Sequence, residues 1–264
     1  MSAAAAPRPW PAEITSRIRA RLAAAANGPW PALLVVSLAG WAALIGGHCA
    51  LVAPIYCGSF ADDWLASGWE GVIWAFLLNS PDRLALSWLL MLLATMPPLL
   101  VQPIAHLWGR RLAPLRAIAI FVAAYAAIWM LAGIVLTAAA ILLKELAGAN
   151  AWTAPILAAA IAALWQASPA RQACLNGCHR IPPLSDVGQA ADRARLRYAL
   201  AFALSCVGAC WALMLLPLIA DGAHIGMMAG VSIFLFAERQ APPRPAGWRF
   251  PLSSIGRGRG DLLA

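Results

Sequence analysis

The sequence predicts an all-α fold, a polytopic membrane helix bundle of about six spans with both termini in the cytoplasm. Of the 264 residues, 62% are hydrophobic and only 11% are charged, and the mean hydropathy is +0.74. A soluble domain usually carries about 25% charged residues, so the charged side chains here are too few to cover a water-soluble globule. Long apolar runs recur along the chain between short polar segments. These observations indicate an integral membrane protein.

The N-terminal segment, residues 1–30, is rich in alanine, proline and arginine. Within it, Ile14, Ile18 and Leu22 recur every four residues opposite the arginines, which predicts a basic amphipathic helix on the cytoplasmic membrane surface. The apolar run that follows predicts the first span at about 31–55. This run is longer than the apolar core of about 7–15 residues in a secretory signal, so we expect an uncleaved span.

Five further spans follow from the lengths of the apolar runs, and tryptophan residues lie near both ends of the second and the fourth span. They are predicted at about 84–108, 115–143, 151–167, 198–220 and 222–237. The last run is short for a crossing, so a re-entrant hairpin is an alternative there. The membrane domain thus covers residues 31–237. The tail, residues 238–264, is rich in proline, glycine and arginine and is predicted to be disordered.

Three prolines interrupt the second span, namely Pro97, Pro98 and Pro103. Proline removes a backbone donor and kinks a helix, so this span is predicted to be bent or broken near its middle. Broken helices inside a membrane are tolerated only where protein or a cavity satisfies the freed backbone groups. We therefore expect the break at Pro97 and Pro98 to open a ligand cavity.

The basic residues support a topology with both termini inside. Of the 19 lysine and arginine residues, 17 fall in segments that this topology places in the cytoplasm, and only Arg83 and Lys144 fall outside. Such an excess is typical of cytoplasmic segments. One of them is predicted as a long polar loop at 168–197. Attraction to anionic lipid explains the net charge of +8, since no basic domain is present to bind nucleic acid.

The fifth predicted span carries sulfur atoms at a spacing of four residues, at Cys206, Cys210 and Met214. On a helix these positions form a stripe roughly 12 Å long on one face. Cysteine and methionine select Cu(I) over hard ions, and Met91 and Met96 of the broken second span would complete such a site. The alternative is that the cysteines are only small residues at a helix–helix contact, and the pattern leaves both interpretations open.

A second pair of thiols lies in the predicted cytoplasmic loop, at Cys174 and Cys178, with His179 beside them. Three residues separate the cysteines, so this is not a haem attachment signal, but the spacing suits a structural thiolate site. A tetrahedral zinc site would need one more ligand, so zinc is the less favoured metal. A reduced thiol pair without a ligand is the alternative.

A third group lies near the outer ends of the spans, at His48, Cys49, Cys57 and His224. It could bind a metal, and Cys49 and Cys57 could equally form a disulfide. The spans hold almost no ionisable residue, which argues against a proton-coupled transporter. The sequence shows no Ser/His/Asp set, phosphate loop or dinucleotide motif, so we expect neither catalytic residues nor enzyme activity.

Three blocks of sequence resemble a bacterial family of predicted metal-binding integral membrane proteins, domain of unknown function 2182. They are residues 88–98 (WLLMLLATMPP), 166–178 (QASPARQACLNGC) and 206–214 (CVGACWALM). The pair Glu238-Arg239 is similar to an acidic-basic pair that follows the last span of that family. The resemblance covers roughly residues 84–240 and implies metal binding without an established reaction.

The leading interpretation is a copper-binding membrane protein that acts in metal transport, delivery or insertion, in contact with the lipid bilayer. The resemblance implies the inner (cytoplasmic) membrane of a bacterium, and a membrane protein complex or a metallochaperone is the expected partner. Two alternatives stay open. One is a non-catalytic accessory subunit whose sulfur atoms only pack, and the other is a membrane thiol–disulfide oxidoreductase.

Overall fold

A computed structural model describes residues 28–47, 81–109, 114–148, 150, 152–183, 189–220 and 223–249, which form helices and connecting segments without a β-strand. The predicted all-α class is confirmed over this part of the chain. In order, the helices are α2 (Trp30–Gly47), α4 (Pro81–Thr95), the 3₁₀ helix η3 (Pro97–Leu100), α5 (Val101–Trp108), α6 (Pro114–Ala147), α7 (Thr153–Ala167), α8 (Pro169–Gly177), α9 (Gln189–Ile219) and α10 (His224–Gln240).

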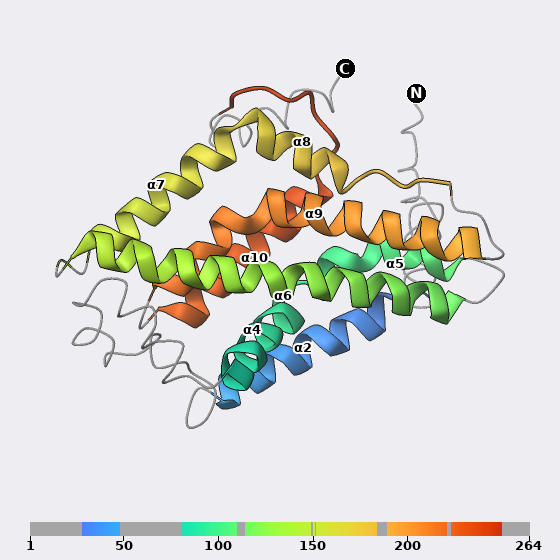
Figure 1. The fold of residues 1–264 in the computed structure, drawn as a ribbon, viewed down its shortest axis with the longest axis horizontal. Helices are drawn as coiled ribbons and strands as arrows, with labels where there is room; N and C mark the ends of the chain where they lie inside the picture. The colour runs from blue at the N-terminus through green and yellow to red at the C-terminus, as the bar shows by residue number, and fades with distance from the viewer. Residues whose placement is uncertain are drawn as a thin grey trace, which may run out of the picture.

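The two longest of these helices, α6 and α9, run side by side through the centre of the molecule (Figure 1). α6 presents Phe121, Tyr125 and Trp129, which are spaced by four residues and so lie on one face. Against them α9 places Tyr198 and Phe202, and the ring centroids of Phe121 and Phe202 lie 5.5 Å apart. Aromatic pairs at this separation add about 0.5–1.5 kcal/mol each to the area that they bury. This aromatic face therefore anchors the core.

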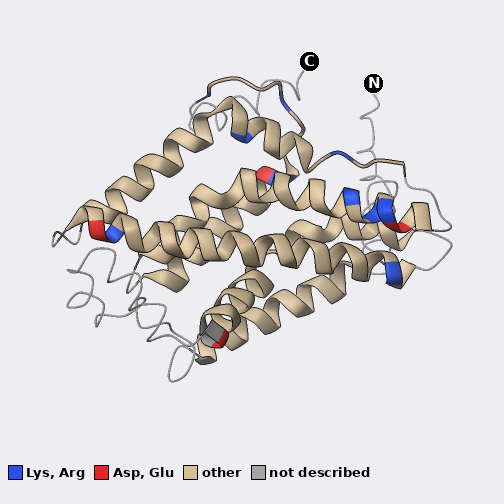
Figure 2. Ribbon diagram, viewed as in Figure 1, with Lys and Arg blue, Asp and Glu red and all other residues tan. Residues whose placement is uncertain are grey.

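Two helices, α6 and α9, are long and apolar enough to cross a membrane by length and composition. Two bent pairs, α4 with η3 and α5, and α7 with α8, raise that number to four if each pair forms one span. The charged residues lie toward both ends of α6 and toward the N-terminal end of α9, and the middle of both helices is apolar (Figure 2). The described residues thus contain two to four candidate spans, and the six-span count stays a prediction.

The predicted break in the second span is confirmed. The segments 84–95 and 97–108 meet at an angle of 57°. Pro97 and Pro98 open η3, where the missing backbone donors cost little because the first N–H groups of a helix have no partner within the helix. Packed side chains fill the break, since Met96, Leu99 and Leu100 are all buried.

A second bend of 68° separates α7 from α8, and α8 and the start of α9 lie within the segment predicted as a polar cytoplasmic loop, 168–197. Ser168 caps α8 by accepting a hydrogen bond from the Arg171 backbone N–H at 3.2 Å, and Pro169 occupies the first helical position. α9 also begins at Gln189, earlier than the predicted start at 198. Polar composition indicated a loop, but both segments carry enough helix-forming residues to be helical.

The segment predicted as a disordered tail begins at residue 238, inside the last described helix. Residues 238–240 belong to α10, and 241–249 follow as an extended strap beside α8. The Arg249 N–H donates to the Ala167 carbonyl oxygen at 2.9 Å, and the Asn176 side-chain amide donates to the Arg244 carbonyl oxygen at 2.7 Å. These backbone contacts attach the strap to both ends of α8.

Helices α2 and α4 cross with almost no space between their backbones. A Cβ atom built on Gly40 would lie 2.6 Å from the Ala94 backbone nitrogen, which is closer than any relaxed contact. Near this point the Ser37 hydroxyl donates to the Ala94 carbonyl oxygen at 2.6 Å. Small residues permit this approach, as is common where membrane helices pack.

Gly40→Ala should therefore destabilise the fold, because the new methyl group meets backbone atoms that cannot rotate away. We expect a loss of about 1–3 kcal/mol or more in the free energy of unfolding, measured by denaturant titration in detergent. Gly46→Ala is the matched control on the same helix, since no atom lies within 4 Å of its Cβ position. Equal stability of the two variants would contradict the close crossing.

Candidate metal centre

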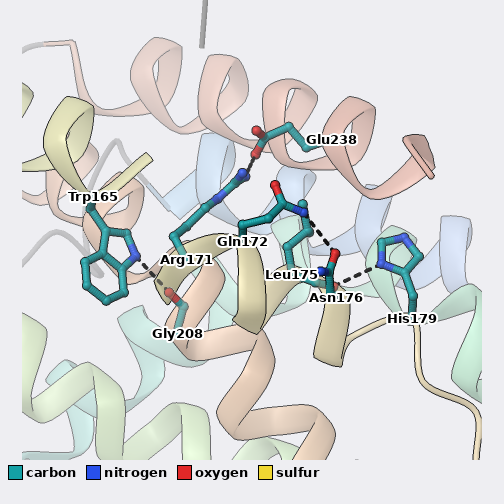
Figure 3. A network of polar contacts seen from close by, with 8 residues as sticks. All are labelled: Trp165, Arg171, Gln172, Leu175, Asn176, His179, Gly208 and Glu238. Atoms are coloured by element: carbon teal, nitrogen blue, oxygen red, sulfur yellow. Dashed lines mark hydrogen bonds and ion pairs between the residues drawn. The ribbon is translucent and has the colours of Figure 1, made fainter. Parts of the chain in front are cut away.

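The candidate centre begins with the close antiparallel packing of α8 on α9. A Cβ atom at Gly177 would lie 2.4 Å from the Ser205 Oγ atom, and one at Gly208 would lie 2.5 Å from the Cys174 Sγ atom. Residue numbers rise along α8 as they fall along α9, so the helices run in opposite directions. The Trp165 indole N–H donates to the Gly208 carbonyl oxygen at 2.8 Å and fixes this packing from α7 (Figure 3).

This register places Cys178, at the C-terminal end of α8, beside Cys206 of α9. Cys206 shares hydrogen bonds with both Cys178 and Cys210, its neighbour one turn further along α9. We call Cys178, Cys206 and Cys210 the thiol cluster. Their exposed fractions are 3%, 0% and 2%, and all three are free thiols. Three reduced sulfur atoms thus meet in the dry interior of the protein.

Two further polar groups contact the sulfur of Cys206. The Tyr125 hydroxyl oxygen of α6 lies 3.4 Å from the Cys206 Sγ atom, and the Arg239 Nη2 group of α10 donates to the same sulfur at 3.4 Å. The Arg239 guanidinium also lies over the Phe202 ring, 5.5 Å from its centroid. Four helices therefore converge on one sulfur atom.

An ion pair beside the thiol cluster joins α8 to α10. Arg171 is buried and donates to the Glu238 carboxylate (Figure 3). Both charged groups lose contact with water, and this cost offsets much of their attraction, so the pair fixes the position of α8 on α10 more than it adds to net stability.

His179, predicted as a ligand beside Cys178, has other partners in the structure. Its Nδ1 atom lies 2.9 Å from the Leu175 carbonyl oxygen, and its Nε2 atom lies 3.1 Å from the Arg239 carbonyl oxygen (Figure 3). Neither ring nitrogen is directed at a thiol. His179 thus links the end of α8 to the end of α10.

The three methionines predicted as ligands are all buried in the hydrophobic core. Met214 lies one turn beyond Cys210 on α9, on the side away from Cys178. Met91 and Met96 belong to the region of α4, which packs chiefly on α2. The cysteines of the thiol cluster belong to the same buried core, so metal binding by the methionines stays a prediction.

The sequence divided the predicted ligands into an intramembrane site and a cytoplasmic loop site, whereas the structure joins Cys178 to Cys206 and Cys210. Residue spacing did not indicate Tyr125 or Arg239 as neighbours of the thiols. The sequence feature that could have indicated Arg239 is the charged pair Glu238-Arg239, directly after the last apolar run.

The third predicted group lay near the outer ends of the spans. Of its members, His48, Cys49 and Cys57 lie outside the described residues, and the His224 Nδ1 atom lies 2.6 Å from the Pro217 carbonyl oxygen.

The thiol cluster offers sulfur ligands in pairs. Among the residues that the structure describes, no group of three or more histidine, cysteine, aspartate and glutamate side chains is arranged to hold one metal ion. Cys178 and Cys210 instead each form a pair with Cys206. Zinc sites almost always have four ligands, whereas Cu(I) binds soft sulfur ligands and accepts two of them. The donor set therefore fits Cu(I) better than zinc.

The fold and the site together define an all-helical protein with membrane-length apolar helices and a buried cluster of free thiols. Residues 85–252 match the family PpoB2, described as a copper chaperone, and the chain belongs to this family. No curated protein and no solved structure matches the chain. The matched region includes the whole thiol cluster and Arg239.

Breaking the buried ion pair should cost more stability than breaking an exposed one. We expect Arg171→Gln to lower the free energy of unfolding by about 2–3 kcal/mol, because it leaves the Glu238 carboxylate buried without its partner. The control is Arg116→Gln, which removes the ion pair between Arg116 and Asp192. The Arg116 side chain is 69% exposed, so we expect this variant to lose less than about 1 kcal/mol in the free energy of unfolding. Denaturant titration of both variants measures the difference, and equal losses would contradict a locking role for Arg171.

Proposed function

We propose that this protein is an integral membrane copper chaperone that holds one Cu(I) ion between Cys206 and a second thiol, either Cys178 or Cys210. The observation that carries the proposal is the meeting of three buried, free thiols at one sulfur atom, in a chain of the copper chaperone family. Thiolate ligands favour Cu(I), and a dry site limits its contact with water and oxidants.

Sharing of Cys206 gives the site a route for handing over the ion. A Cu(I) ion bound by Cys206 and Cys210 can exchange Cys210 for Cys178 without losing its bond to Cys206. Cys174 lies one turn further along α8 and is partly exposed, so it is the next sulfur toward the surface. This order of thiols supports delivery of copper to a partner protein, either a metallochaperone or a membrane complex.

The membrane arrangement in this proposal has six spans, with α2 and α10 as the first and the sixth, in the inner membrane of a bacterium. This part of the proposal relies on the resemblance to the predicted metal-binding family, domain of unknown function 2182. In this topology α8 lies on the cytoplasmic side. Reporter fusions test the topology. A reporter that is active only outside the cytoplasm should be active when it is fused after Gly148. A reporter that is active only in the cytoplasm should be active when it is fused after Pro183. The opposite pattern would overturn the topology.

Metal binding by the purified protein tests the ligand assignment. Under anaerobic, reducing conditions in detergent, the wild type should bind one equivalent of Cu(I) in competition with a chromophoric chelator. Substitution of a residue that only supports the ligands typically lowers metal affinity by roughly 10–100-fold. Cys206→Ser should lower the Cu(I) affinity by more than this, because both sulfur pairs include Cys206. Cys178→Ser and Cys210→Ser should lose less, since each keeps one pair.

Met214→Leu is the matched control, because it removes a sulfur atom from the same helix while keeping the volume of the side chain. We expect its Cu(I) affinity to equal that of the wild type. A wild-type protein that binds no Cu(I), or a Cys206→Ser variant that binds as tightly as the wild type, would show that the thiols serve another purpose, such as packing in an accessory subunit.

A further inference from the structure

Arg239 is a buried cation whose surroundings are sulfur and aromatic rings. Arg239 is only 5% exposed, and its Nη2 group donates a hydrogen bond to the Cys206 sulfur. Its Nη1 group is buried and has no partner among the described residues. The neighbouring carboxylate of Glu238 pairs with Arg171 instead. A full positive charge thus faces the thiol cluster with one donor group unused.

Burying an unbalanced charge costs several kcal/mol, so a charge in this position needs a counter-charge. Metal ligation by cysteine supplies one, because the bound form of the side chain is the thiolate. One Cu(I) ion with two thiolates carries a net charge of −1, and the guanidinium brings the total to zero. The complex of a divalent ion with the same two thiolates has no net charge, so the positive charge of the guanidinium would remain unbalanced.

We infer that Arg239 is a specificity-determining residue, whose charge makes the thiol cluster select a monovalent over a divalent metal ion. This inference rests on the proposed copper-binding function and adds the basis of its selectivity. Arg239 acts through the sulfur atoms and does not bind the ion itself. Its Nη2 group orients the shared Cys206 sulfur, its guanidinium also hydrogen-bonds Cys178, and its Nη1 group is left available to a sulfur of the pair.

The choice of arginine suits this role. The guanidinium stays charged in every protein environment and presents several donors in one plane, so it can contact two sulfur atoms at once. The Phe202 ring below it provides a favourable surface for the cation. Arg171 with Glu238, and His179 with the Arg239 carbonyl oxygen, already attach α10 to α8, so attachment of the helix does not require the Arg239 side chain.

The test compares two metals on the purified full-length protein in detergent. Affinities for Cu(I) and Zn(II) are measured by competition with chromophoric chelators, for the wild type and for Arg239→Gln. We expect the variant to lose about 10–100-fold in Cu(I) affinity while its Zn(II) affinity stays the same or rises. Equal losses for both metals would indicate a structural role, and unchanged affinities would indicate no role; either result would overturn the inference.

Two further variants keep the test decisive. Arg244→Gln removes an exposed arginine of the adjacent strap and should leave both affinities unchanged. Arg239→Met removes the charge and keeps an apolar side chain against Phe202, so it should lose the preference for Cu(I), and an unchanged preference would overturn the inference even if Arg239→Gln does not fold. X-ray absorption of the copper-loaded wild type should show two sulfur neighbours, and three would remove the charge argument.

Failure of this inference is distinguishable from failure of the proposed function. If the wild type binds no Cu(I), the copper-binding function itself is wrong. If the wild type binds Cu(I) and Cys206→Ser does not, but the ratio of Cu(I) to Zn(II) affinity is the same with and without Arg239, only the role of Arg239 is wrong.

Discussion

The close packing of α8 on α9 is the constraint on which the thiol cluster depends. Gly177 and Gly208 leave out the side chains that would hold the helices apart, and only at this separation does Cys178 meet Cys206. Without it, the two pairs of cysteines would remain separate, one on each helix. The indole N–H of Trp165 and the Ser168 cap then fix the angle at which α8 lies.

Two neighbouring residues of α10 serve the two sides of this packing. Successive residues on a helix are rotated by about 100°, so Glu238 and Arg239 cannot face the same partner. Glu238 turns toward Arg171 and holds α8, whereas Arg239 turns toward the sulfur of Cys206. The position of the helix and the electrostatics of the thiol cluster are therefore set by adjacent residues with separate functions.

Local chemistry explains which parts of the fold could be predicted from the sequence. The break at Pro97 and Pro98 follows from the missing backbone donors, and the apolar helices follow from their composition. α8 was missed because its residues are polar, although Ser168 followed by Pro169 is a typical helix start. Arg239 was missed because its burial depends on how α10 packs, which no local pattern contains.

The candidate site shows the same division between local and long-range information. Softness of the side chains selected all the sulfur residues equally, and only packing shows that Cys206 contacts Cys178, whereas Met91 belongs to α4, which packs chiefly on α2. A methionine fills irregular gaps as well as it binds copper, so its presence on a helix face does not assign its role. The contact between Cys178 and Cys206 joins distant parts of the chain through two glycines, and spacing along the sequence cannot express it.

A copper chaperone must both hold its ion and release it, and the described contacts separate these needs. The apolar and aromatic packing of α6 on α9 holds Cys206 and Cys210 in the rigid core. Cys178 instead lies on α8, where exposed polar contacts to the strap at 241–249 supplement the packing on α9. Polar contacts between partly exposed groups exchange with water more readily than buried apolar ones. Under the proposed function, Cys178 is therefore the thiol best placed to pass the ion toward the surface, and Cys206 and Cys210 are those best placed to hold it.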